Sequence, residues 1–236
     1  MQKQGLLWLL STPKSMKGGI KLNYKVWVYG TPFSGKSHFA DTFPKPFVIN
    51  TDGNLQFYKN ANGVQVSNYE EFVRALEEFD TEKYDTLILD VADHIYDMCR
   101  ESFLDKNGIE HESDYTSNGS QTYGKGWTLL REDFWYMISK VRNIPTNLVL
   151  ISHDAEKEEK GKLGTTKTIY APATIPKQIA SKLSGIMHFV GHCYKDGDEY
   201  VVSFGGNDNE MSGYRLPIKE KVIGNTYQEF IENIEN

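Results

Sequence analysis

One run of residues has the types and spacing that bind the phosphates of a nucleotide. It comprises Gly30, Thr31, Pro32, Phe33, Ser34, Gly35, Lys36 and Ser37, with His38 next, and it matches G-x-x-x-x-G-K-[ST] in full. The glycines let the backbone fold tightly, so that its N–H groups point at phosphate oxygens. The ammonium of Lys36 neutralises phosphate charge, and the hydroxyl of Ser37 suits Mg²⁺, which prefers oxygen ligands. The run therefore predicts a site for ATP with Mg²⁺.

Two acidic residues follow apolar segments and are candidates for the same site. Asp90 ends Leu87-Ile-Leu-Asp90, where its carboxylate would reach Mg²⁺ through the water shell of the ion. It is also suited to cap the next helix. Val91 follows it, so the glutamate that serves as base in the AAA+ and helicase pattern is absent. We assign the base to Asp52, although Asp52 and Gly53 also fit an ordinary turn.

Two basic side chains complete the predicted catalytic set. His153 ends the segment NLVLISH, where a polar side chain can contact the γ-phosphate and report its presence to the following loop. It also fits a residue at the end of a strand. Arg215 follows the predicted C-terminal hairpin, and we expect it to act on the nucleotide of a neighbouring subunit; the alternative is a surface arginine.

Strand and helix patterns alternate along the chain, which favours an α/β fold. Apolar segments predict strands at 24–29, 47–50, 86–89 and 148–151, and helical spacing predicts helices at 69–79, 93–104, 127–141, 175–183 and 227–234. A hairpin is expected at 186–194 and 199–204. The polar stretches 106–126 and 155–167 predict loops, and Trp127 is expected on the core face of its helix. Such a mainly parallel sheet binds its ligand at the carboxyl ends of the strands.

Composition limits the classes of protein that fit. The length of 236 residues predicts a single domain, 1–236, with a core of about 24–216, an N-terminal extension 1–23 and a C-terminal segment 217–236. The two cysteines predict reduced thiols in a cytoplasmic protein. No apolar run reaches 18 residues, so no membrane span is expected. The net charge of −6 requires that any contact with nucleic acid use local basic patches.

The order of several segments resembles one family. After GTPFSGKS come FVINTDGN, YDTLILD, YGKGW and NLVLISHD, an order that is similar to the phage-encoded nucleotide-binding ATPases, minimal RecA-core proteins of phage recombination modules. The resemblance covers about Lys25 to Leu216. It implies a RecA-like P-loop NTPase fold with a mainly parallel sheet and a C-terminal antiparallel hairpin. It also implies an ATPase in a bacterial host cell that binds single-stranded DNA, promotes annealing or strand pairing with a single-strand-binding protein, and forms rings or filaments.

The resemblance also implies roles for single residues. Lys36 and Ser37 would hold phosphate and Mg²⁺, Asp90 would be the Walker-B acid, and His153 the γ-phosphate sensor. Asp52 stands where RecA-like proteins carry a glutamate, so the base is one methylene shorter and slow hydrolysis is expected.

The two polar stretches contain the candidate residues for DNA. Aromatic rings can stack on bases and lysines can meet phosphates. The candidates are Tyr115, Tyr123, Lys125, Lys157, Lys160, Lys162 and Lys167. Three glutamates lie among the later lysines, so a solvated loop of mixed charge is the alternative.

Two other functions fit a phosphate-binding loop. A small-molecule kinase would use the same loop, but it would need an arginine-rich lid, and neither polar stretch contains arginine. A nucleotide-dependent switch module would bind ATP without turnover and contact a protein partner.

Overall fold

The centre of the molecule is a largely parallel sheet. The computed structural model describes residues 22–160, 166–173, 175–205 and 208–235. Its main sheet has ten strands. Eight of them follow the order β12 (Val222–Gly224), β10 (Glu199–Ser203), β9 (Phe189–Asp196), β1 (Lys25–Gly30), β7 (Asn147–Lys160), β4 (Thr86–Asp90), β2 (Pro46–Asn50) and β3 (Asn62–Gln65). Strands β9 to β3 of this order pair in parallel, and β10 and β12 add antiparallel pairs at one edge. The predicted α/β fold is confirmed.

Helices cover both faces of this sheet. Successive side chains of β1 alternate between two hydrophobic clusters, because side chains in a strand point to opposite faces. Helices α1 (Lys36–Asp41) and α6 (Tyr227–Asn233) cover the face of Val26 and Val28. The face of Trp27 and Tyr29 is covered by α2 (Tyr69–Glu77), α3 (Ala92–Asn107), α4 (Lys125–Arg142) and α5 (Lys177–Ser184). No helix among the described residues is long and apolar enough to cross a membrane.

The pairing register brings three strand ends to one edge. Gly30 at the end of β1 lies beside His153 of β7. On the other side of β7, Asp90 at the end of β4 lies beside Ile151. The P-loop, the acid after β4 and the polar residues of β7 therefore meet at the carboxyl edge of the sheet.

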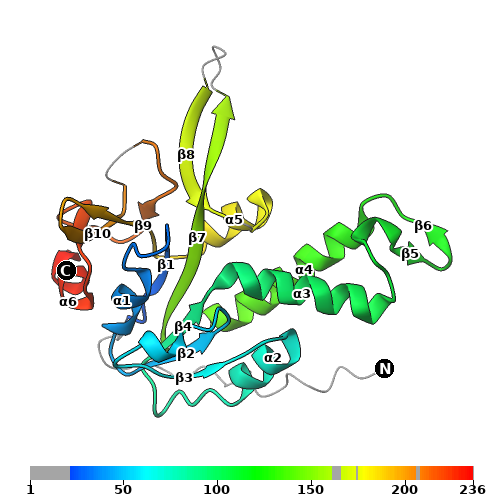
Figure 1. The fold of residues 1–236 in the computed structure, drawn as a ribbon, viewed down its shortest axis with the longest axis horizontal. Coiled ribbons are helices and arrows are strands. Elements are labelled where there is room, and N and C mark those ends of the chain that lie inside the picture. The colour runs from blue at the N-terminus through cyan, green and yellow to red at the C-terminus, as the bar shows by residue number, and fades with distance from the viewer. Residues whose placement is uncertain (1–21, 161–165, 174, 206–207, 236) are drawn as a thin grey trace.

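The predicted loop at 155–167 is wrong in its described part. Strand β7 continues to Lys160 and pairs antiparallel with β8 (Thr166–Pro172), and Figure 1 shows this ribbon projecting from the sheet. The sequence of this ribbon is rich in Lys and Glu and lacks the apolar alternation that signals a strand. Strand β3 at the opposite edge was also not predicted; two of its four residues are Asn62 and Gly63, which are rare in strands.

The other polar stretch is shorter than predicted. Helix α3 extends to Asn107 and α4 begins at Lys125; a 3-10 turn at Glu112–Asp114 and the short strands β5 (Thr116–Ser117) and β6 (Ser120–Gln121) lie between them. The prediction that Trp127 joins the core is wrong, since its side chain is 42% exposed. Gly126 instead faces inward, where a Cβ would lie 2.1 Å from the carbonyl oxygen of Glu112. This close approach directs Trp127 outward.

Candidate functional site

The loop between β1 and α1 requires both of its motif glycines. A Cβ on Gly30 would lie 2.2 Å from the carbonyl oxygen of Cys193 on β9. Gly35 has a φ of 87°, and a Cβ there would lie 2.3 Å from Nδ2 of Asn225. Neither position accepts a side chain, so the tight path of the loop depends on residues that the motif specifies.

The ammonium of Lys36 lies inside this loop. It donates hydrogen bonds to the carbonyl oxygens of Gly30, at 2.8 Å, and Thr31, at 2.7 Å. Burial lowers the pKa of Lys36. A buried cation whose closest partners are carbonyl oxygens gains from an anion nearby, because charge interactions are strong where water is excluded. The loop is thus suited to phosphate.

The hydroxyl of Ser37 and the carboxylate of Asp90 lie side by side. Ser37 Oγ donates to Asp90 Oδ2 at 3.3 Å. Asp90 is 2% exposed, and burial raises its pKa to about 6 despite hydrogen bonds from Tyr58 and Ser37. These are hard oxygen ligands, and Mg²⁺ at nucleotide phosphates takes few protein ligands and keeps several waters. The pair therefore fits Mg²⁺.

Asp52 lies near the phosphate-binding loop, and two asparagines hold its carboxylate. Its Oδ1 accepts from Asn50 Nδ2 at 2.9 Å, and its Oδ2 accepts from Asn54 Nδ2 at 2.6 Å. The following Gly53 has a φ of 81°, as expected for the predicted turn. Asn50 also lies 3.5 Å from Asp90 Oδ2, so one amide connects the two acids. Asp52 can therefore be part of this turn and still lie beside the phosphate-binding loop.

His153 is fixed by Asp93, a residue that the sequence did not indicate. The backbone N–H of His153 donates to Asp93 Oδ2 at 2.7 Å, and its ring Nδ1 lies 3.5 Å from the same oxygen. This contact raises the pKa of His153. The imidazole of His153 is half-buried and can donate a hydrogen bond.

These groups surround one cavity of about 720 Å³, which we call the P-loop cavity. Its size falls within the range of small-molecule sites. The lining residues are Pro32, Phe33, Ser34, Gly35, Lys36, Ser37, His38, Asp52, Asn54, Phe57, Asp90, Val91, His153, Tyr200 and Asn225. Tyr200 and Asn225 come from the antiparallel edge of the sheet, and no sequence motif marks them.

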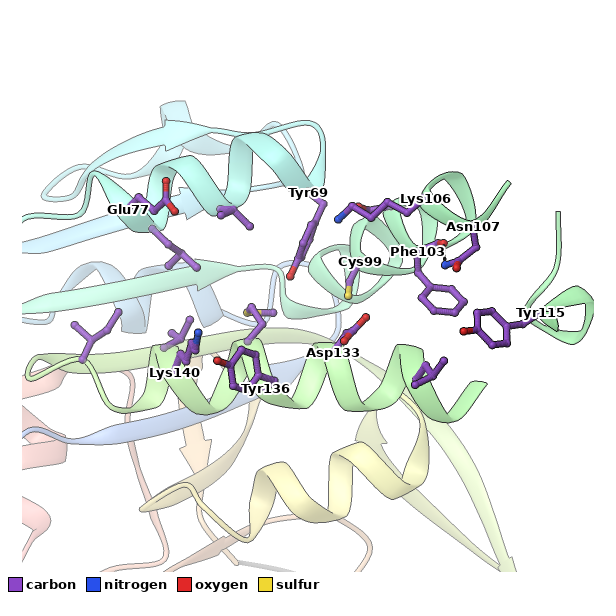
Figure 2. A pocket seen from close by; sticks show the side chains of 17 residues that line it. Tyr69, Glu77, Cys99, Phe103, Lys106, Asn107, Tyr115, Asp133, Tyr136 and Lys140 are labelled. Atoms are coloured by element: carbon purple, nitrogen blue, oxygen red, sulfur yellow. Dashed lines mark hydrogen bonds between the residues drawn. The ribbon is translucent and has the colours of Figure 1, made fainter. Parts of the chain in front are cut away.

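A second cavity, of about 420 Å³, lies between α2, α3 and α4, and we call it the helical cavity. Figure 2 shows Tyr69, Cys99, Phe103 and Tyr136 around it. It contains no residue of the phosphate-binding loop. Burial raises the pKa of the Cys99 thiol to about 12, so the thiol is uncharged.

Arg215 lies at the other end of the sheet. It follows β11 (Gly213–Tyr214), which pairs with the beginning of β9, and its guanidinium donates to the carbonyl oxygen of Gly185. The beginning of β9 pairs with the beginning of β1, whereas the P-loop follows the end of β1. Within one chain, Arg215 is therefore not part of the P-loop cavity.

The candidate residues for DNA fall into two separate regions. Tyr123 and Lys125 are exposed near β5 and β6, at the far end of α3 and α4 in Figure 1. Tyr115 is less available there, because its ring stacks on Phe103 with centroids 6.0 Å apart. Lys157 lies on the β7–β8 ribbon, where its Nζ donates to the carbonyl oxygen of Pro172 at 2.6 Å.

Two of the remaining lysines, Lys160 and Lys167, lie toward the outer end of the described ribbon. Lys160 is the last residue of β7, and Lys167 is in β8. Lys162 lies outside the described residues. The structure thus does not gather the predicted DNA residues into one described patch.

Two solved structures are similar to this chain at low sequence identity. The flagellar accessory protein FlaH from Methanocaldococcus jannaschii is similar over 85% of this chain and 83% of its own, with 10% identity and a TM-score of 0.43. The RadB recombinase is similar over 76% of this chain and 79% of its own, with 12% identity and a TM-score of 0.41. Likeness at this level indicates neither activity nor partner for this chain. No curated protein matches the chain significantly.

One protein-family model also matches most of the chain. The family described as AAA domain matches residues 22–216, which include the phosphate-binding loop, Asp90 and His153. Because this match covers most of the chain, the chain belongs to the AAA domain family and is an ATPase-type P-loop domain.

Proposed function

We propose that the chain binds ATP with Mg²⁺ and hydrolyses it slowly, and that it acts on single-stranded DNA as a phage recombination protein. The observation that carries the nucleotide part is the meeting of Lys36, Ser37 and Asp90 in the P-loop cavity. A cation, a hydroxyl and a carboxylate are the groups that a Mg²⁺-bound triphosphate needs.

Each side chain has a distinct role in this proposal. Lys36 compensates the charge of the β- and γ-phosphates, while Ser37 and Asp90 hold Mg²⁺, which when bound neutralises the charge that develops on the phosphate oxygens. Asp52 orients the attacking water and accepts its proton. For this to occur, the hydrogen bonds from Asn50 and Asn54 to Asp52 must weaken, or the carboxylate must accept from the water as well. Either requirement agrees with slow turnover.

The coupling to DNA rests on the position of His153. Its carbonyl oxygen accepts from Ala173 N at 2.9 Å, so His153 joins the base of the β7–β8 ribbon. Its N–H is bound by Asp93 in the first turn of α3, and α3 leads toward β5 and β6. A γ-phosphate that moves His153 would therefore displace both candidate DNA regions.

The direct test is the ATPase rate with and without single-stranded DNA, at low and moderate salt. We expect slow basal turnover that DNA stimulates, with stimulation falling as salt rises. A rate that DNA does not change at any salt would remove the DNA role and leave a nucleotide-binding module.

A matched set of lysine variants tests the ribbon. Lys157 is already bonded to Pro172, so the test changes Lys160, Lys162 and Lys167 to alanine; the control changes the exposed Lys45, Lys83 and Lys221. With a labelled oligonucleotide and ATP, we expect fluorescence anisotropy to show weaker binding only for the ribbon variant. Equal affinities for the two triple variants would exclude the ribbon from the DNA site.

The switch module remains the second candidate. The structural observation that favours it is that both carboxylate oxygens of Asp52 accept hydrogen bonds from asparagine amides. These bonds compete with a hydrogen bond from the attacking water. ATP binding without turnover, with or without DNA, would support it. The kinase alternative has no such support, because no arginine lines the P-loop cavity in the described part of the chain.

A further inference from the structure

A tyrosine outside the sequence motifs makes the shortest of three contacts to one carboxylate oxygen of Asp90, the proposed Mg²⁺ ligand. The hydroxyl of Tyr58 donates to Asp90 Oδ2 at 2.7 Å. Ser37 Oγ is 3.3 Å and Asn50 Nδ2 is 3.5 Å from the same oxygen. A hydrogen bond from a hydroxyl to a buried carboxylate is strong, because the acceptor carries charge. Tyr58 is therefore a principal partner of this carboxylate.

The loop that carries Tyr58 is fastened to the helix that follows the P-loop. Asp41, in the last turn of α1, is buried, and its carboxylate accepts three consecutive backbone N–H groups. These are Lys59 N at 2.9 Å, Asn60 N at 3.1 Å and Ala61 N at 2.8 Å. Helix α1 also carries Lys36 and Ser37. The position of Tyr58 is thus set relative to the residues proposed to hold phosphate and metal.

We propose that Tyr58 is a positioning residue for the Mg²⁺ of the bound nucleotide, which it orients through the carboxylate of Asp90. This inference rests on the proposed function. Rotation of the Asp90 side chain would break the bond to Tyr58, so the bond restricts the carboxylate to one orientation. Partners that orient a metal ligand without touching the metal commonly change metal affinity by about 10- to 100-fold when they are removed.

The variant Tyr58→Phe removes the hydroxyl and retains the ring that packs beside the core. Binding of a fluorescent ATP analogue is measured in EDTA and across a Mg²⁺ titration. We expect the half-saturating Mg²⁺ concentration to rise about tenfold, while affinity in EDTA stays unchanged. The matched control is Tyr136→Phe, which removes a tyrosine hydroxyl at the helical cavity and should behave as the wild type.

A second variant tests the fastening of the loop. Asp41→Asn removes the charge that holds the three N–H groups, and we expect a smaller shift of the Mg²⁺ requirement in the same direction. Thermal unfolding of each variant establishes that it is folded under the assay conditions.

The possible outcomes separate this inference from the proposed function. If the wild type requires Mg²⁺ for tight binding and Tyr58→Phe has the same requirement, Tyr58 does not position the metal. If Tyr58→Phe weakens binding equally with and without Mg²⁺, its role is structural and the inference is also wrong. If the wild type binds the analogue equally well in EDTA and in Mg²⁺, the metal part of the proposed function fails with it.

Discussion

The P-loop cavity and the helical cavity are both lined by charged groups, but these groups are arranged differently. The walls of the P-loop cavity carry an ammonium, hydroxyls, carboxylates and an imidazole, supplied by the phosphate-binding loop, the start of α1 and residues at or after β2, β4 and β7. The walls of the helical cavity combine apolar side chains of α2, α3 and α4 with an uncharged thiol and the charged residues Glu77, Lys106, Asp133 and Lys140. Of the two cavities, the P-loop cavity is the one that the phosphate-binding glycine loop lines. Substitutions in the two cavities should therefore have different effects.

The largest effect is expected from Lys36→Ala. It leaves phosphate charge without its buried cation, and loss of one such preorganised group costs up to about a thousandfold in turnover. The paired change in the helical cavity is Lys140→Ala, which should leave the ATPase rate unchanged. A steady-state phosphate-release assay compares them. Similar rates for both variants would remove the distinction between the cavities.

Asp52→Asn should lower turnover by about a hundredfold, the usual contribution of a general base. ATP affinity should stay within about twofold of the wild type, because a base acts on the water and not on the bound ground state. Single-turnover kinetics and equilibrium binding separate the two quantities. Unchanged turnover would show that Asp52 is only the turn residue that its bonds to Asn50 and Asn54 also suggest.

A smaller effect is expected from the pH dependence of stability. Because burial raises the pKa of Asp90 from 3.8 to about 6, the folded state binds this proton more tightly than the unfolded state. Its contribution to stability is present below the unfolded pKa and is lost as pH rises through the folded pKa. Between pH 5 and pH 7, the free energy of unfolding should fall by about 1 kcal/mol more in the wild type than in Asp90→Asn. Urea unfolding of the nucleotide-free proteins measures this; equal slopes would mean that Asp90 is ionised throughout.

The smallest effect on chemistry should come from Met137→Ala in the helical cavity. Met137 is buried, so its truncation should lower the free energy of unfolding by about 2 kcal/mol. The ATPase rate at a temperature where the protein is folded should not change. A change in ATP affinity at such a temperature would reveal coupling between the two cavities.

The sequence indicated the phosphate-binding loop because binding of phosphate requires particular residue types in one continuous run. Glycine at positions 30 and 35 and lysine at 36 have few substitutes for holding phosphate, so a local pattern was sufficient. Asp93 and Tyr58 were missed because their contacts join parts of the chain that lie 60 and 32 residues apart. No local pattern indicates such partners.

The fold was predictable to the extent that it is built on buried strands. The apolar segments at β1, β2, β4 and β7 were recognised because parallel strands covered on both faces are apolar throughout. The outer part of the β7–β8 ribbon was not, since its strands pair through the backbone in a sequence of mixed charge that lacks apolar alternation. Trp127 was misplaced because a close backbone approach at Gly126, not helical periodicity, sets the first turn of α4.

The assignment of the nucleotide site is tested most directly by the affinity of the chain for ATP with Mg²⁺, measured by calorimetric titration of the wild type, Lys36→Ala and Lys140→Ala. We predict one ATP per chain for the wild type and for Lys140→Ala, with heat that disappears in EDTA. For Lys36→Ala we predict affinity weakened by about a hundredfold or more. Equal affinity of Lys36→Ala and wild type, or loss of binding in Lys140→Ala instead, would contradict the assignment of the P-loop cavity as the nucleotide site.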